Sequence, residues 1–242
     1  MSDSENPYEA PKAELGSEPE QVGGSIENTL AGNAVLDIGD VMSEAWQRTN
    51  GIKGIVIGGG LLIYLGVIVV TVVLGLVLGF GDQQSLLATG ITQLITMLMI
   101  YPFFAGVFMV GLRQSVGLPV SFDQQFAYYG AALPILAVAL LQSIASAIGF
   151  VLLIIPGLYL AFALALSIPL KVEKQLPVLD CLTTSLKLVN KKFLNVAVLA
   201  IVASFISTLS FITIIGWIWA MPWMLMVYAI TYRQLAGCEI EA

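Results

Sequence analysis

The chain alternates between long apolar stretches and short polar connections. Residues 54–80 and 86–112 contain no charged side chain, and neither do the longer stretches 131–170 and 193–232. A helix rises 1.5 Å per residue, so about 20 apolar residues cross the roughly 30 Å of hydrocarbon in a bilayer. The two shorter stretches therefore predict one span each. The two longer ones are about twice the length that one crossing requires, and they predict hairpins of two spans.

This pattern predicts an all-α fold, a polytopic membrane helix bundle with six transmembrane helices. The membrane domain covers residues 34–236, between a disordered cytoplasmic tail (1–33) and a short cytoplasmic C-terminus (237–242). The two hairpin turns are predicted near Ile154–Gly157, where a proline precedes a glycine, and near Ser210–Gly216. The predicted spans are 54–80, 86–112, 131–153, 157–171, 193–212 and 216–234.

Short amphipathic segments precede the first, third and fifth spans, at residues 36–48, 121–129 and 178–191. In the first, Ile38, Met42, Ala45 and Trp46 are predicted to share one side of a helix. In the segment 178–191, the predicted apolar face includes Val178, Leu179, Leu182, Leu186 and Val189. We interpret these segments as helices on the inner membrane surface. Three copies of one unit, a surface helix followed by a hairpin, explain the pattern; any chain that enters a membrane from the cytoplasm also shows it.

The basic residues set the predicted orientation. If both long stretches are hairpins, all 10 Lys and Arg lie on one side of the membrane, as the positive-inside rule requires of the cytoplasmic side. Both chain termini are then cytoplasmic, and the protein is a multi-pass protein of the bacterial inner membrane. Trp217, Trp219 and Trp223 are predicted at the outer rim, since tryptophan prefers membrane interfaces. Pro222 is expected to kink the last span.

Half of the positive charge falls between the fourth and fifth spans. These five lysines, which outnumber Glu173 and Asp180 there, are candidate contacts for anionic lipid headgroups. Ordinary orientation by the positive-inside rule explains the same residues. The candidate headgroup contacts are Lys171, Lys174, Lys187, Lys191 and Lys192.

The first 33 residues are polar and acidic, the composition of a segment that buries too little surface to fold. Within them, one tyrosine stands between two prolines, and an extended segment of this kind can dock in a groove of a cytoplasmic protein. A disordered solubilising tail is the alternative. The candidate partner-binding residues are Asn6, Pro7, Tyr8 and Pro11.

The sequence contains no recognisable catalytic constellation. It has no histidine and only 2 cysteines, which excludes histidine-based triads and leaves too few cysteines for a metal site. Gly58–Gly60 is not followed by the Lys of a phosphate-binding loop. We therefore expect no enzyme activity, no cofactor, no metal site and no nucleic-acid partner.

The predicted spans contain no charged residue of the kind that ion-coupled transport uses. Neutral polar residues remain, and the glutamines are the most costly to bury. The candidate intramembrane polar contacts are Gln93, Gln142, Ser143 and Tyr101. They either bond neighbouring helices or line a wet cavity. Pairs of small residues, such as Gly54 and Gly58, suit helix packing within a bundle or in a homo-oligomer.

Residues 36–235 also resemble a poorly characterised group of bacterial six-span inner-membrane proteins, which includes the membrane domain of some glycerophosphodiester phosphodiesterases. The resemblance rests on Ser43–Trp46, Ile155–Tyr159, Asp180–Leu188 and Tyr232–Leu235. Where relatives often carry Ser-Trp, this chain has Ser185-Leu186. The resemblance implies the six-span fold, and no phosphodiesterase activity is carried over because that domain is not in this sequence.

Together these features favour a membrane scaffold or accessory protein without a catalytic site, which contacts lipid or a protein partner through its cytoplasmic face. The alternative is a transporter or channel for a neutral or apolar small solute, with Gln93 and Gln142 near the pathway. An intramembrane enzyme has no support from residue spacing.

Overall fold

A computed structural model describes residues 21–78 and 86–239 of the chain. Within them every regular element is a helix, apart from one isolated β-bridge between Val22 and Cys238. The predicted all-α fold is confirmed for this part of the chain. The candidate tail residues Asn6 to Pro11 lie outside the described residues, as does Asp82 between the first two spans.

The first hairpin consists of α3 (Lys53–Leu78) and α4 (Leu86–Ser115). Both helices are apolar on every side over most of their length, as expected of helices that face lipid. Pro102 lies inside α4 without ending the helix. The second half of α4, from Pro102 onward, is largely buried, whereas most of α3 is exposed.

The second hairpin is preceded by a 3₁₀ helix, η1 (Asp123–Ala131), at the second of the three predicted amphipathic segments. It consists of α5 (Ala132–Leu152) and α6 (Ile154–Ala163), joined by the extended residue Leu153. Pro156 lies in the first turn of α6, where the missing N–H costs nothing. The two helices approach so closely that a Cβ on Gly149 would lie 2.9 Å from Gly157 Cα.

The predicted fourth span, 157–171, falls within the apolar segment 154–173, which is not one continuous helix. The helix breaks after Ala163, and a separate helix, α7 (Ser167–Glu173), continues the chain. Side chains from other helices bond the backbone at the break. Ser185 Oγ donates to Ala163 O at 2.8 Å and accepts from Leu166 N at 3.1 Å, while the Tyr228 hydroxyl donates to Ala165 O.

The third hairpin follows the amphipathic helix α8 (Val178–Lys191) and consists of α9 (Phe193–Ile212) and α10 (Ile214–Ala236). The turn at Thr213 falls within the predicted region. A short helix followed by a hairpin thus recurs three times in the element order, with α2 (Ile38–Arg48), η1 and α8 as the short helices. Whether the three units are true repeats stays a prediction.

Five helical segments are long and apolar enough to cross a membrane: residues 53–77, 86–115, 123–152, 154–173 and 193–210. A membrane protein is therefore supported. Within the described residues, the sixth predicted span, 216–234, is not among them. The count of six spans is accordingly not confirmed.

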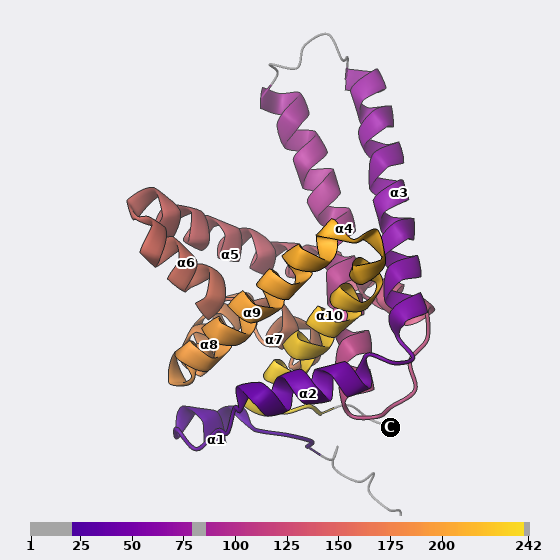
Figure 1. Cartoon of the computed structure of the whole chain (residues 1–242). Coiled ribbons are helices and arrows are strands. Elements are labelled where there is room, and N and C mark those ends of the chain that lie inside the picture. The colour runs from indigo at the N-terminus through magenta and orange to yellow at the C-terminus, as the bar shows by residue number, and fades with distance from the viewer. Residues whose placement is uncertain (1–20, 79–85, 240–242) are drawn as a thin grey trace, which may run out of the picture.

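The hairpins meet at one end of the bundle, which we call the base. The base comprises α1 (Ile26–Leu30), α2, α8 and the ends of α4, α7 and α10 that meet them. In Figure 1 the α3–α4 and α5–α6 hairpins leave the base in different directions, and α2 runs beneath α10. We call the hairpin parts that extend from the base the arms. The fully buried side chains of the base include Leu112, Leu170, Leu188, Met226, Ile230, Tyr232 and Leu235.

Two amphipathic faces differ from the predicted ones. In α2 the buried residues are Val41 and Ala45, while Trp46 keeps 60% of its surface exposed. In α8 the buried face is Cys181, Ser185, Leu188 and Val189, and Leu179 is exposed. The other predicted positions are largely confirmed. Ala45 and Val189 are buried, and the partly buried residues that pack against the core include Ile38, Met42, Val178 and Leu182.

Candidate functional site

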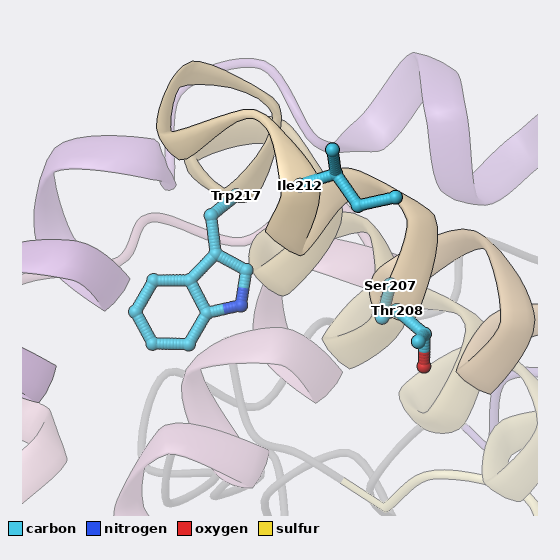
Figure 2. Close-up of a pocket in the computed structure, with 4 residues that line it drawn as sticks. All are labelled: Ser207, Thr208, Ile212 and Trp217. Carbon is cyan, nitrogen blue, oxygen red and sulfur yellow. The ribbon is translucent and has the colours of Figure 1, made fainter.

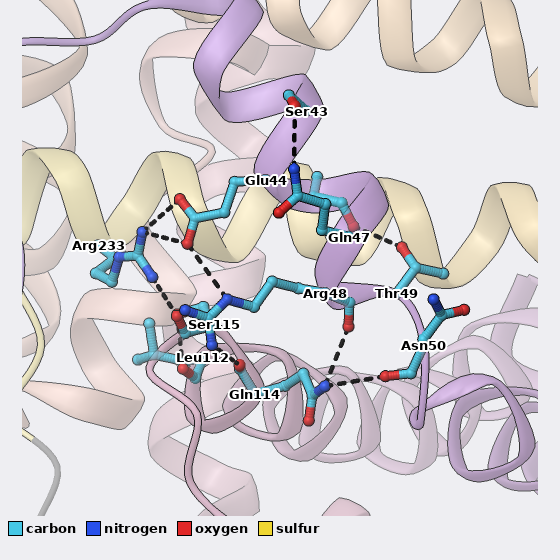
Figure 3. A network of polar contacts seen from close by, with 11 residues as sticks. Ser43, Glu44, Gln47, Arg48, Thr49, Asn50, Leu112, Gln114, Ser115 and Arg233 are labelled. Carbon is cyan, nitrogen blue, oxygen red and sulfur yellow. Dashed lines mark hydrogen bonds and ion pairs between the residues drawn. The ribbon is translucent and has the colours of Figure 1, made fainter.

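The base holds an ion pair between residues that are far apart in sequence (Figure 3). Both carboxylate oxygens of Glu44, on α2, accept from Arg233 Nη2 on α10, at 2.9 and 2.7 Å. A second guanidinium nitrogen of Arg233 donates to the carbonyl of Ser115, at the end of α4. Arg233 therefore links the ends of α2, α4 and α10. Charge-assisted bonds of this kind are stronger than neutral ones.

The same network ties α4 to the connection between α2 and α3. Gln114 Nε2 donates to the carbonyls of Arg48 and Asn50, both at 3.1 Å. Arg48 returns a bond to Gln114 O at 3.3 Å, and its Nε lies 3.5 Å from Glu44. Figure 3 shows that these side chains converge on the end of α4. The network fixes the point at which the chain enters α3.

A second polar cluster lies where α7 and α10 end. The Glu173 side chain is only 2% exposed, and its carboxylate accepts from the Tyr232 hydroxyl at 2.7 Å and from Glu239 N at 2.8 Å. Lys174 Nζ lies 3.3 Å from Glu173 and 2.7 Å from Glu239. Each buried charge therefore has an oppositely charged or hydrogen-bonding partner, as burial requires.

The two described ends of the chain are joined at the base. Val22 and Cys238 exchange two backbone hydrogen bonds of 3.0 Å, and Gly24 N donates to Arg233 O at 3.0 Å. Gly24 is glycine because a Cβ there would lie 2.0 Å from Gln234 O. Thr29 adds a side-chain bond of 2.6 Å to Leu235 O. The N-terminal and C-terminal segments consequently lie on the same end of the bundle.

The structure divides the five predicted headgroup lysines. Lys174 is buried in the ion pairs described above, and Lys171 donates to Leu176 O at 2.9 Å. They stabilise the base, so the prediction that they face headgroups is wrong for Lys174. Lys187 and Lys191 are exposed on α8, and Lys192 is half-buried after it. Lys187 and Lys191 form no ion pair within the described part of the chain.

The candidate intramembrane polar residues do not form a shared interior site. Gln93 and Ser143 are exposed on α4 and α5, which contradicts the prediction of an interior contact for Gln93. Gln142 is half-buried on α5, and its Oε1 is buried without a hydrogen-bond partner. Tyr101 packs beside a small cluster of Ala105, Ile135 and Val172. The described interior thus offers single polar groups rather than a polar pathway.

The 3₁₀ helix contributes a buried amide that the sequence did not indicate. Gln125 is fully buried, and its Nε2 donates to Ile55 O and Phe122 O, both at 3.1 Å. Gly59 and Gly106 make room for it, since a Cβ on either would lie about 2 Å from Gln125 atoms (2.2 and 2.1 Å). This contact explains one of the three consecutive glycines of α3 by packing and not by ligand binding.

Two depressions lie on the α10 side of the molecule. One, shown in Figure 2, has a volume of about 380 Å³ and is lined by Ser207, Thr208, Ile212 and Trp217. Its hydroxyls already donate, Thr208 to Ser204 O at 2.8 Å and Ser207 to Met224 Sδ at 3.5 Å. The other, of about 50 Å³, lies between the end of α2 and α10.

The tryptophans of α10 do not all mark an outer rim. Trp223 Nε1 donates to Met42 O of α2 at 3.3 Å, and Lys53 Nζ lies 4.7 Å from the centroid of the Trp219 ring. Trp223 therefore contacts the middle of α2, and Trp219 contacts the first residue of α3. The prediction of an outer position is wrong for Trp219 and Trp223.

Burial also controls the cysteine on α8. Cys181 is fully buried and its Sγ lies 3.4 Å from Leu176 O. Burial raises the pKa of the Cys181 thiol to about 11, with smaller and opposing effects of Lys171 and Asp180. Such a thiol is a poor nucleophile at neutral pH. Among the described residues no group of three His, Cys, Asp or Glu side chains is arranged to hold a metal ion.

Some residues of the base could have been found from sequence. Glu44 and Arg233 belong to the two short motifs at either end of the resemblance, and the structure brings these motifs together. Ser185 belongs to the motif between them. Gln114 and Gln125 had no comparable signal. Comparison of the chain with protein-family models, curated proteins and solved structures finds no match.

Proposed function

We propose that the chain is a non-enzymatic scaffold or accessory protein of a bacterial inner membrane, with its base and both termini on the cytoplasmic side. It contacts membrane lipid, or a protein partner, through the surface of the base. The membrane domain has six passes in this proposal, with α10 as the sixth.

One observation carries the proposal: the charged residues of the base fall into two groups. Glu44, Arg233, Glu173 and Lys174 are engaged with each other or with Glu239 and hold helices together. Lys187 and Lys191 project from α8 and contribute nothing to that network. A lysine near an anionic leaflet contributes about 1 kcal/mol of attraction. The exposed face of α8 is therefore suited to lipid headgroups.

The position of the chain ends supports a common side for both termini. The bridge between Val22 and Cys238 places the start of the described chain beside its end. An even number of passes follows if the arms cross the membrane. A cytoplasmic partner of the tail that contains Tyr8 would then meet the base.

A solute pathway has less support. Gln93 is exposed, so the two glutamines do not frame an interior channel. The buried and unpartnered Oε1 of Gln142 is the one observation in its favour. If Gln142 lines a pathway, Gln142→Leu should abolish flux of the solute in proteoliposomes while the protein still folds.

Lipid retention tests the main proposal. Full-length protein reconstituted in nanodiscs of mixed zwitterionic and anionic phospholipid should carry an excess of anionic lipid after transfer to detergent, counted by mass spectrometry. The double variant Lys187→Gln, Lys191→Gln should lose most of this excess, and Lys187→Arg, Lys191→Arg should keep it. Equal lipid counts in all three proteins would refute a headgroup contact at α8.

The tail is tested separately. A photocrosslinker at position 8 in cells should capture a defined cytoplasmic protein, and Tyr8→Ala with the crosslinker at position 9 should not. If neither full-length protein captures anything, the tail does not recruit a partner.

A further inference from the structure

A small notch opens where α2 ends and α3 begins, facing α10. It is lined by Trp46, Thr49, Asn50, Lys53 and Trp219 and has a volume of about 50 Å³. None of these residues was a candidate headgroup contact in the sequence. The notch is separate from α8, whose exposed lysines carry the proposal above.

The cation of the notch is held in place. Lys53 Nζ donates to Asn50 Oδ1 at 3.2 Å and lies over the Trp219 ring at 4.7 Å from its centroid. Asn50 is itself fixed, because its carbonyl accepts from Gln114 of the base network. No carboxylate lines the notch. The nearest acidic residue along α2, Glu44, is already paired with Arg233 and Arg48. The ammonium group of Lys53 is therefore available to bind an anion.

The walls of the notch are aromatic and open. Trp46 and Trp219 keep 60% and 40% of their surfaces exposed. Water alone is a poor environment for two indoles side by side, whereas the headgroup region of a bilayer suits them. Lys53 is the first residue of the apolar segment Lys53–Val77, so the notch lies at the level where a membrane surface would meet that segment.

The first backbone N–H groups of α3 are further hydrogen-bond donors near the notch. No hydrogen bond joins the N–H groups of Lys53, Gly54 or Ile55 to another group in the described part of the chain, because α3 begins at Lys53. Open space surrounds the Cβ position of Gly54. The cation and the aromatic walls identify the site, and these donors favour an anion there.

We propose that this notch binds the phosphate of a membrane phospholipid, with Lys53 as the charge partner and Trp46 and Trp219 against the glycerol and upper acyl region. The proposal rests on the membrane location in the proposed function and adds a specific lipid site to it. Beyond the notch, α3 carries exposed apolar side chains such as Leu61 and Leu65, along which acyl chains can lie.

The test uses short-chain probes with the full-length protein in detergent. Dihexanoyl phosphatidylglycerol, kept below its micellar concentration, should change the tryptophan fluorescence saturably. Dihexanoyl glycerol lacks the phosphate and should bind at least about tenfold more weakly, since a charge-assisted hydrogen bond is lost. Inorganic phosphate should give no saturable change of fluorescence in the concentration range used for the lipid. If inorganic phosphate binds as well as the lipid, the site is for free phosphate and the lipid assignment is overturned.

Variants then locate the binding. Lys53→Gln should weaken the phospholipid titration about tenfold, and Lys53→Arg should restore most of the affinity. Trp219→Phe should remove part of the fluorescence change while circular dichroism stays unchanged. Unaltered binding by a folded Lys53→Gln protein would overturn the proposal.

Lys187→Gln distinguishes the two proposals. This exposed lysine of α8 should leave the short-chain titration unchanged, even though it lowers retention of anionic lipid in nanodiscs. If Lys187→Gln weakens the titration as much as Lys53→Gln, the response is a general charge effect and not a site at the notch. If nanodisc retention proves insensitive to Lys187 while the Lys53 effect remains, the α8 proposal fails and the notch stands.

Discussion

The base and the arms are built from different interactions. In the base, side chains contact partners far along the chain, such as Glu44 with Arg233, Asn195 with Leu36 O at 2.6 Å, and Thr29 with Leu235 O. In the arms, α6 contacts mainly its hairpin partner α5, and α3 exposes apolar side chains over most of its length. The base is thus specified by directional polar bonds, and the arms by apolar length alone.

This difference reflects the two solvents. Lipid drives no apolar association between helices, so arm helices need only small residues and close packing to stay together. At the membrane surface, water competes for every polar group, and long-range polar contacts hold only where they are buried among apolar side chains. Disrupting a contact in the base should therefore affect the whole fold, whereas changes on an arm surface should stay local.

The largest effect is expected from Arg233→Met. The substitution removes the donor of the Ser115 carbonyl and leaves the partly buried Glu44 carboxylate with Arg48 alone, 3.5 Å away, and losing a hydrogen bond to a charged group costs about 1.5 to 3 kcal/mol. Thermal unfolding in detergent should show a large loss of stability. Arg233→Lys keeps the charge but not the bidentate geometry, so its stability should lie between those of the unchanged protein and Arg233→Met. If Arg233→Met unfolds at the same temperature as the unchanged protein, the network does not stabilise the fold.

A smaller loss is expected where α4 receives the 3₁₀ helix. In Gly106→Ala the new Cβ would lie 2.1 Å from Gln125 O, a backbone atom that cannot move alone. Overpacking of this kind costs about 1 to 3 kcal/mol. The matched control is Gly60→Ala on α3, where nothing lies within 4 Å and no loss is expected. Equal unfolding temperatures for both variants would contradict the described contact.

Ser185→Ala tests the break between α6 and α7. It leaves Ala163 O and Leu166 N without a partner in a buried setting, which costs about 1 to 2 kcal/mol. Thr183→Ala on the same helix removes only a local bond of an exposed hydroxyl to Asp180 O and should be nearly neutral. The comparison is made by denaturant or thermal unfolding of both variants in one detergent. If Ser185→Ala leaves the stability unchanged, the hydrogen bonds of Ser185 do not stabilise the break between α6 and α7.

The smallest effect concerns reactivity and not stability. Because the pKa of the Cys181 thiol is raised to about 11, its thiolate stays scarce from pH 7 to 9 and increases only as the pH approaches that value. Maleimide modification at position 181, located by peptide mass mapping, should be slow in the folded protein and fast after unfolding. Leu179→Cys, at a 67% exposed position two residues away, should react rapidly. Similar rates at positions 179 and 181 would contradict the burial of α8.

The sequence predicted the arms well because their signal is simple. Uninterrupted apolar length predicts a span regardless of neighbours. The turn at Thr213 falls within the predicted region, whereas the turn at Leu153 comes one residue before the predicted Ile154–Gly157, which forms the start of α6. The break at Leu164–Leu166 was missed, since it depends on Ser185 and Tyr228 from distant helices. Periodicity carries no information about such partners.

The base was predicted less well for the same reason. Helical spacing correctly placed α2 and α8 and most of their buried positions, but Trp46 and Leu179 look like core residues until the position of α10 and α7 is known. Charge counts identified Lys174 as a headgroup contact, although Glu173 and Glu239 bind it. Such pairings depend on tertiary structure that a pattern along the chain does not contain.

Cysteine accessibility across the membrane tests whether the base lies on the cytoplasmic side and the tips of the arms on the opposite side. In a Cys181→Ser, Cys238→Ser background, Lys187→Cys marks the base and Ile155→Cys marks the tip of an arm, both at exposed positions. With a membrane-impermeant maleimide on intact cells, the account predicts labelling at position 155 and none at position 187 until the membrane is permeabilised. Labelling of position 187 from outside, or of both positions from the same side, would contradict it.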